Sequence, residues 1–275
     1  DPSDKTARIR EESGRVIEYA FDVCVCAFGA RTAFFGLVGQ EYVLPFKTWE
    51  HLTALETRLR ELATITHPRI AIVGGGATGV EAAVALHERL GALGLPIGKR
   101  SIDLYQAAPQ ILPGFSPTTV RKTQDLLEEL GVRIHTHASV TETRAQSLIL
   151  KTGIECAADL ILWAPGVEPH VLEKSAHLSH DERGALLPDH TLRLAPGVFA
   201  GGDVVMLREG QRPVPKNAQT AMKMGAVIAN NILRERAGKP LVSFSYHSPG
   251  VMLWLGGTSI AELGGLSLVS PFFTW

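Results

Sequence analysis

The stretch from Arg69 to Leu86 decides the fold, and it reads Arg-Ile-Ala-Ile-Val-Gly-Gly-Gly-Ala-Thr-Gly-Val-Glu-Ala-Ala-Val-Ala-Leu. A short apolar run, Ile70 to Val73, leads into a cluster of glycines. Strong helix formers follow, with apolar side chains at helical spacing. The pattern predicts a strand, a tight turn and a helix.

Three glycines of this turn, Gly74, Gly76 and Gly79, have the G-x-G-x-x-G spacing of dinucleotide-binding sites. In such sites the first glycine turns the chain, the second lets the backbone approach a pyrophosphate, and the third lets helix and strand pack closely. The helix N-terminus presents unpaired N–H groups to the phosphates. A second predicted strand, Ser101–Tyr105, follows about one βαβ unit later, as this interpretation requires. A glycine-rich turn without a ligand is the alternative.

Gln106 follows the second strand, where dinucleotide sites usually carry an acid that binds the adenosine ribose. It can hydrogen-bond a hydroxyl but has no charge to repel a 2′-phosphate, so we expect weak discrimination between NADH and NADPH. No Arg or Lys follows directly to bind a 2′-phosphate, which leaves NADH slightly favoured. Asp103, the nearest acid, lies inside the strand and is interpreted as structural.

The composition excludes some classes of function. The 27 Lys and Arg residues balance 28 Asp and Glu, and no basic stripe is interleaved with aromatic residues, so nucleic-acid binding is not expected. No apolar run reaches the length of about 18 residues needed to span a bilayer. A length of 275 residues favours two domains over one.

The cysteine and histidine residues do not predict a metal site. Three cysteines in a chain of this length argue against a disulfide framework and for a reducing compartment. Cys24 and Cys26 alternate along an apolar run and are interpreted as buried thiols on one face, with a metal or redox role as the alternative. His135 and His137 would lie on one strand face, but no third ligand is evident.

Further elements follow from apolar periodicity. The predicted strands are Val16–Tyr19, Phe21–Phe28, Val132–His135, Ser147–Lys151, Leu160–Trp163 and Val198–Ala200, and the predicted helices are Trp49–Thr64, Thr118–Leu130 and Lys216–Ala237. The run Phe21–Phe28 is nearly continuously apolar, which predicts a central strand.

Four stretches, in this order, resemble one family of proteins: Cys26–Thr32, Gly74–Glu81, Leu162–Val167 and Phe199–Asp203. They are similar to the flavoprotein reductases with two dinucleotide domains of the pyridine nucleotide-disulfide oxidoreductase superfamily. Within it the chain most resembles the type II NADH:quinone oxidoreductases, which are single-subunit respiratory NADH dehydrogenases. Phe34-Phe35-Gly36, Ile111–Pro113 and Ala261–Leu266 share this similarity, which covers nearly the whole chain.

The resemblance implies an α/β fold with two Rossmann-like dinucleotide-binding domains, the NAD(P)H domain being inserted in an incomplete FAD domain. It implies the first part of the FAD domain in residues 1–66, the NAD(P)H domain in 67–167, the second FAD part in 168–240 and a C-terminal region in 241–275. The family's N-terminal FAD fingerprint and its membrane-anchoring C-terminal helix have no match. We therefore expect a chain truncated at both ends, from a parent that is a complete flavoenzyme.

The resemblance also implies a reaction, in which hydride passes from nicotinamide C4 to flavin N5 and electrons pass to a quinone. The implied cofactors are FAD and NADH, with NADPH as an alternative donor. Gly202 and Asp203 match positions that hold the flavin's ribityl chain, although an ordinary turn is the alternative. Ala218 and Gln219 begin a helix whose N-terminus would stabilise negative charge on reduced flavin. Gly166 is likewise assigned to cofactor binding.

Glu81 is the candidate catalytic residue. It matches a family glutamate near the stacked nicotinamide and flavin rings, where it would steady the nicotinamide or relay protons to a reduced quinone. Alternatively, it only favours the positive end of its own helix.

Two departures from the family leave the acceptor open. Ala27-Phe28-Gly29 replaces the usual A-T-G, and Lys223-Met224 does not match the second half of the A-Q-x-x-x-Q-Q signature beside the quinone tunnel. A ferredoxin or a small oxidant is therefore an alternative to the quinone, and a non-catalytic nucleotide-binding protein is a third interpretation. For the parent, the resemblance implies a cytoplasmic protein, peripheral on the inner face of the membrane, and leaves a homodimer open.

Overall fold

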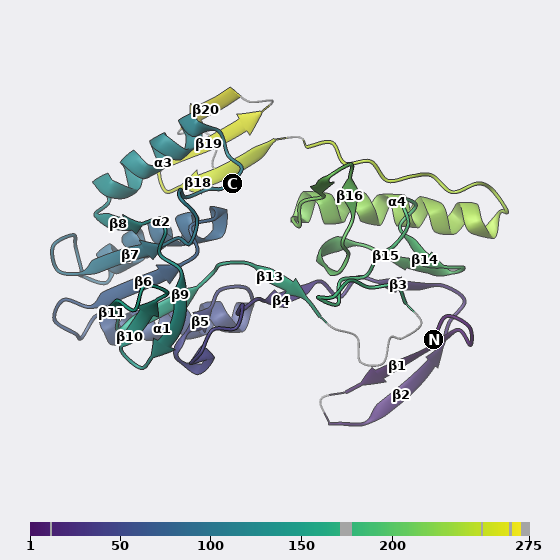
Figure 1. Cartoon of the computed structure of the whole chain (residues 1–275), viewed down its shortest axis with the longest axis horizontal. Helices are drawn as coiled ribbons and strands as arrows, with labels where there is room; N and C mark the ends of the chain where they lie inside the picture. Colours follow the sequence, from purple (N-terminus) through teal and green to yellow (C-terminus); the bar gives the residue numbers. More distant parts are fainter. Residues whose placement is uncertain (12, 171–177, 249, 264–265, 271–275) are drawn as a thin grey trace. The chain divides into compact units, whose positions relative to one another are not determined.

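The computed structural model describes residues 1–11, 13–170, 178–248, 250–263 and 266–270 (Figure 1). The chain forms two compact units. Unit 1 comprises Asp1–Arg31 and Val167–His247, and unit 2 comprises Thr32–Gly166 and Ser248–Trp275. Both contain helices and strands, which confirms the predicted α/β class. Gly264-Gly265, within the Ala261–Leu266 stretch quoted above, lies outside the described residues.

A five-stranded parallel sheet forms the centre of unit 2, and its order is β5-β12-β6-β7-β8. The strands are β5 (Leu44–Pro45), β6 (Arg69–Val73), β7 (Ser101–Tyr105), β8 (Val132–His135) and β12 (Leu160–Trp163). In the register, Ile72 of β6 pairs with Leu104 on one side and Leu162 on the other. The strands predicted here are confirmed.

Helices α1 (Trp49–Leu62), α2 (Ala77–Ala92) and α3 (Pro117–Glu129) also belong to unit 2. The hydroxyl of Thr48 accepts a hydrogen bond from the His51 N–H at the start of α1, and Ser116 caps α3 in the same way. All three helices bury apolar side chains with the sheet; these include Leu55, Leu59, Leu62, Val80, Leu90 and Leu127. Each contributes about 1.5–3 kcal/mol by burial.

Two small antiparallel sheets complete unit 2. One consists of β9 (Val140–Arg144), β10 (Ser147–Leu150) and β11 (Glu155–Ala157), and it shares an apolar cluster with Val73, Tyr105 and Trp163 of the parallel strands. The other consists of β18 (Val251–Leu255), β19 (Thr258–Leu263) and β20 (Leu266–Ser270), with Leu253 and Ile260 packed into the cluster of α2. The parallel strands are therefore buried on both faces, which explains their continuous apolar sequence.

Unit 1 contains a hairpin of β1 (Thr6–Arg10) and β2 (Val16–Ala20), and a sheet of order β14-β15-β3. This sheet consists of β14 (Arg193–Ala195), β15 (Val198–Ala200) and β3 (Cys24–Cys26). Helix α4 (Ala218–Arg236) packs on it through Met224 and Ile228. Two further short pairs are β16 (Arg208–Glu209) with β17 (Arg212–Pro213), and β4 (Ala30–Thr32) with β13 (Val167–Pro169).

The prediction of a central strand at Phe21–Phe28 was wrong. The strand consists of Cys24–Cys26, and among the described residues it pairs only with β15. Val25 is 43% exposed whereas Cys26 is buried, so only one face of this apolar run packs into the core. A continuous apolar run does not by itself distinguish a strand buried on both faces from one buried on one.

The compact units differ from the predicted domains in their boundaries. Unit 2 includes residues 32–66, which were predicted in the FAD domain, and residues 248–275, which were predicted in a separate C-terminal region. The physical reason is that β5 pairs with β12, while α1 and β18 contribute side chains to the core around α2. The assignment of each domain to a cofactor stays a prediction.

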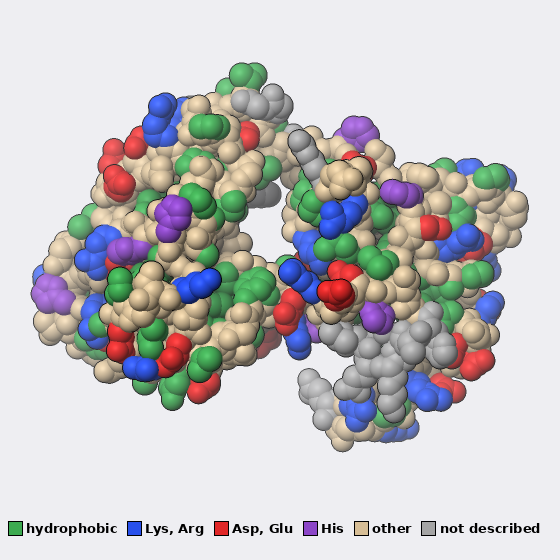
Figure 2. Space-filling model, in the orientation of Figure 1, with side chains coloured by type: hydrophobic (Ala, Val, Ile, Leu, Met, Phe, Trp, Pro, Cys, Tyr) green, Lys and Arg blue, Asp and Glu red, His purple; other side chains and the backbone are tan. Residues whose placement is uncertain are grey.

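On the face seen in Figure 2, basic and acidic side chains are interspersed rather than segregated. None of the helices in the described part of the chain has the length and apolar character needed to cross a membrane.

Candidate functional site

The glycine turn between β6 and α2 is a close backbone crossing. Gly74 has φ +109°, and a Cβ atom there would lie 2.7 Å from backbone atoms of Ala164 and Pro165. A Cβ on Gly79 would lie 1.8 Å from the backbone oxygen of Gly74. Side chains are therefore excluded at the first and third glycines, as the fingerprint predicts.

Gly76 differs, because a Cβ there would meet no atom within 4 Å. It is the N-cap of α2, and no side chain caps this helix among the described residues. The first N–H groups of α2 therefore adjoin open space at the positive end of the helix dipole. This arrangement fits a dinucleotide diphosphate.

Gln106 is buried at the end of β7 and holds the glycine turn. Its side-chain oxygen accepts the Gly75 N–H at 3.1 Å, and its amide nitrogen donates to the Gln110 carbonyl at 3.2 Å. This contact with the turn was not predicted from the sequence. The hydrogen bond between Gln106 and an adenosine ribose stays a prediction. The side-chain oxygen of Gln106 accepts one hydrogen bond and has a second lone pair that could accept a ribose hydroxyl.

A cleft of about 340 Å³ lies where β6, β7 and β12 end. Its lining includes Phe34, Phe35, Gly74, Gln106, Trp163 and Pro165. Parallel α/β sheets bind ligands at this end of their strands. Gly166 directly follows the cleft residue Pro165, has φ +149°, and accepts the Ala33 N–H at 3.1 Å through its carbonyl oxygen.

Glu81 lies on α2, where a carboxylate oxygen accepts the Trp254 N–H of β18 at 2.9 Å. Burial raises the pKa of Glu81 above its usual range, although this hydrogen bond opposes the effect. Glu81 lies beyond the first turn of α2, so the helix dipole acts on it only weakly. The link from Glu81 to the C-terminal sheet was not predicted from the sequence, and the catalytic role of Glu81 stays a prediction.

In unit 1, Gly202, Asp203 and Ala218 line a cavity of about 540 Å³ together with small residues of α4. Gly202 has φ +78°, which glycine adopts without strain. The small lining residues and the N-terminus of α4 fit a planar cofactor with developing negative charge. Gln219 is exposed and does not line this cavity, so its predicted role has no support from position.

Lys216, which lies just before α4, was not among the predicted site residues. Its ammonium group donates to the Asp203 carbonyl oxygen at 2.7 Å. Burial lowers the pKa of Lys216, opposed by the charges of Asp203 and Asp181. The bond ties the segment before α4 to the Gly202–Asp203 turn.

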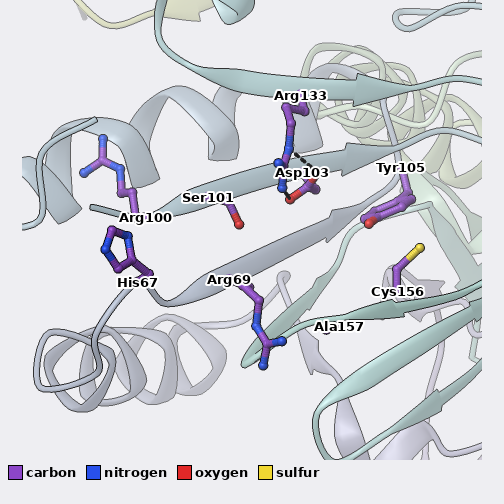
Figure 3. A pocket seen from close by; sticks show the side chains of 9 residues that line it. All are labelled: His67, Arg69, Arg100, Ser101, Asp103, Tyr105, Arg133, Cys156 and Ala157. Carbon is purple, nitrogen blue, oxygen red and sulfur yellow. Dashed lines mark hydrogen bonds and ion pairs between the residues drawn. The ribbon is translucent and has the colours of Figure 1, made fainter. Parts of the chain in front are cut away.

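A second pocket of unit 2, of about 440 Å³, contains charged residues near the start of β6 and β7 (Figure 3). Arg133 donates to both carboxylate oxygens of Asp103, at 2.6 and 2.8 Å, and His135 contacts the same carboxylate at 2.7 Å. Burial opposes ionisation of Asp103, but these hydrogen bonds hold its pKa below the usual range. The structural interpretation of Asp103 agrees with this pairing.

The predicted common strand face for His135 and His137 was wrong. Strand β8 ends at His135, and His137 has φ +53°, which is not a strand conformation. In the part of the chain that the structure describes, no group of His, Cys, Asp and Glu side chains could hold a metal. All three cysteines are free, and burial raises the pKa of Cys26 to about 12, with Cys24 adding to the effect.

Comparison with known proteins connects these sites to a family. Residues 1–225 match the family model described as pyridine nucleotide-disulphide oxidoreductase. The chain is 32% identical over 258 residues to the demethylphylloquinone reductase NdbB of Synechocystis sp., covering 90% of this chain and 62% of that protein. It is 33% identical over 208 residues to the type II NADH:quinone oxidoreductase of Haemophilus influenzae, covering 72% of this chain and 46% of that protein. The chain thus spans about half to three fifths of these relatives.

Solved structures show the same fold. NDH2 from Plasmodium falciparum, solved in complex with NADH, has a TM-score of 0.83 at 15% identity and covers 99% of this chain and 76% of its own. An FAD-dependent pyridine nucleotide-disulphide oxidoreductase from Desulfovibrio vulgaris has a TM-score of 0.73 at 24% identity, covering 95% of this chain and 65% of its own. The predicted fold of two Rossmann-like domains is confirmed. The chain belongs to the pyridine nucleotide-disulphide oxidoreductase family.

Proposed function

We propose that this chain provides the NAD(P)H-binding unit and part of the FAD-binding unit of a flavin-dependent NAD(P)H dehydrogenase. The observation that carries the proposal is the glycine turn. Gly74 and Gly79 are too closely packed for any side chain, while the space over Gly76 and the N-terminus of α2 is open. A turn with no ligand would need the close packing but not the open, uncapped helix end.

Each site residue has a proposed task. Amides at Gly76 and the start of α2 bind the diphosphate, and Gln106 orients the adenosine ribose. Asp203 holds the ribityl chain of FAD, and the start of α4 near Ala218 offers its positive dipole end to the ring. FAD held by these residues would supply hydride acceptance from the nicotinamide and electron transfer to an acceptor. Glu81, whose pKa is raised by burial, steadies the nicotinamide or holds a proton for the reduced acceptor.

A quinone is the proposed acceptor, and NADH the proposed donor. The support comes from the relatives, which are a demethylphylloquinone reductase and an NADH:quinone oxidoreductase. The second candidate is a dehydrogenase with another acceptor, a ferredoxin or a small oxidant. This candidate stays open because Lys223 and Met224 depart from the quinone signature. The Lys223 ammonium group instead donates to the His247 carbonyl at 2.6 Å and lies 5.8 Å from the Tyr246 ring centre. Association with a membrane surface, a cytoplasmic location and a homodimer stay predictions.

Flavin content and acceptor choice test the proposal. The protein is purified and its visible spectrum recorded, NADH is added under anaerobic conditions, and reoxidation is followed with a short-chain quinone, ferricyanide or a ferredoxin. We expect a flavin spectrum that NADH bleaches and the quinone restores. Restoration by ferredoxin or ferricyanide but not by quinone would favour the second candidate. A colourless protein that binds NADH without oxidising it would favour a non-catalytic binding protein.

A further inference from the structure

In the turn Phe34–Leu37, an aromatic residue, Phe35, has a strained backbone conformation. The Leu37 N–H donates to the Phe34 carbonyl at 2.9 Å, and the two central residues, Phe35 and Gly36, have φ +51° and +76°. Positive φ at both central residues is characteristic of a type I′ turn, which favours Asn, Asp or Gly at the first. A bulky residue there is a genuine outlier.

The neighbours of Phe35 fix the main chain, so the exposure of its ring is imposed by the turn. The Trp163 indole N–H donates to the Ala33 carbonyl at 2.8 Å, and Phe34 stacks on Trp163 with ring centres 6.3 Å apart. Leu37, on the other side, is buried. Between these anchors the Phe35 side chain is 67% exposed. The fold thus supports a costly conformation that leaves an apolar ring in water, and such outliers concentrate at functional sites.

Phe35 lines the same cleft as Gly74 and Gln106. Its ring lies against Gly166, where a Cβ atom would be 3.5 Å from the end of the phenyl ring. Gly166 follows β12, which lies on one side of β6, while Gln106 follows β7 on the other side. With the diphosphate at the glycine turn and the adenosine ribose at Gln106, the remaining half of the dinucleotide lies over the end of β12.

We propose that Phe35 is a platform that contacts the nicotinamide ring of the bound dinucleotide. The inference rests on the proposed function and deepens it. Planar rings attract each other in offset-stacked or edge-to-face contact. A platform already held in place by its turn loses little conformational freedom on binding, which favours affinity.

Three variants test the proposal, with binding of NADH and of ADP-ribose, which lacks the nicotinamide, measured by calorimetry. Phe35→Asn removes the ring and supplies a residue that the turn favours. Phe35→Tyr keeps the ring. Trp49→Ala is the matched control, because Trp49 is 75% exposed in the same unit but does not line the cleft.

We expect Phe35→Asn to weaken NADH binding about two- to tenfold, the range that ring stacking provides. Its affinity for ADP-ribose and its melting temperature should not fall, and the Tyr and Trp49 variants should bind as the wild type does. Unchanged NADH affinity in Phe35→Asn would overturn the proposal that Phe35 contacts the nicotinamide. An equal loss of affinity for ADP-ribose would overturn it as well. If the wild-type protein bound neither ligand, the proposed function itself would fail, and the platform with it.

Discussion

The backbone oxygen of Gly74 lies 1.8 Å from the place that a Cβ atom on Gly79 would occupy. Strand β6 and helix α2 therefore contact each other through bare backbone at this crossing. We expect Gly79→Ala to lower the free energy of unfolding by about 2–4 kcal/mol, because the added methyl group forces the turn and helix apart. Urea denaturation measures this loss. A variant as stable as the wild type would show that the turn is looser than described.

Gly76→Val, unlike Gly79→Ala, should weaken ligand binding and leave the stability of the fold nearly unchanged. Its Cβ meets no protein atom and its φ of −75° is open to any residue, so the melting temperature should change little. The branched side chain would occupy the space over the helix N-terminus, and NADH binding should fall at least about a hundredfold, as expected when a backbone approach is blocked. Gly91→Ala, at the far end of α2, is the control and should bind NADH normally. Retained affinity in Gly76→Val would contradict the diphosphate assignment.

Gln106→Glu should shift the balance between the two nicotinamide cofactors. A carboxylate can still accept the Gly75 N–H, but its charge repels a 2′-phosphate. We expect the affinity ratio of NADH to NADPH to rise about tenfold, equivalent to about 1.4 kcal/mol. Titration with each cofactor gives this ratio. Gln146→Glu adds the same charge at an exposed turn and should not alter it, and equal ratios in both variants would count against the ribose assignment.

Glu81→Gln should change the pH dependence of stability. Burial raises the pKa of Glu81 above its ordinary value of 4.5, so the folded chain holds the proton more tightly than the unfolded chain. Between the ordinary and the raised pKa the folded state binds more protons, and stability therefore falls as the pH rises through this interval. Glutamine keeps an oxygen for the Trp254 N–H without the charge. We expect Glu81→Gln to melt about 1–3 °C above the wild type at pH 8.

Below the ordinary pKa of the glutamate, the wild type and Glu81→Gln should melt alike, because the carboxyl group is neutral in both states of the chain. Melting curves from pH 3.5 to 8, with steps of about half a unit, locate the interval. Glu129→Gln, at an exposed position on α3, is the control. Parallel curves for wild type and Glu81→Gln over the whole range would show that the buried carboxylate carries no penalty.

The local pattern of the chain was enough to predict the elements around the glycine turn. The strand predicted at Ile70–Val73 is Arg69–Val73, and the helix predicted at Thr118–Leu130 is Pro117–Glu129. The helix predicted from Lys216 begins at Ala218, because the Asn217 side chain accepts the Thr220 N–H and caps it. Periodicity and caps involve residues a few positions apart, so they are visible in the sequence.

Contacts between distant residues were not predictable. The bond from the Trp254 N–H to Glu81, and the bond that Gln106 accepts from Gly75, depend on how strands and helices pack, which no spacing encodes. The same holds for Phe35, since the positive φ arises in a turn whose sequence lacks the usual Asn-Gly signal. The glycine fingerprint located the candidate site, whereas the groups that orient it became visible only in the fold.

Strand β12 lies between β5 and β6, although it follows both in the chain, so that Leu162 pairs with Leu44 on one side and with Ile72 on the other. During synthesis, β5 and β6 leave the ribosome without the strand that joins them. The nascent sheet therefore lacks the pairing between β5 and β6 through β12 until residues 160–163 emerge. This pairing joins strands that are distant in the sequence, and non-local pairing is intrinsically slow. Over that interval the backbone edge of β6 that later pairs with β12 has free N–H and C=O groups, with which another chain could pair.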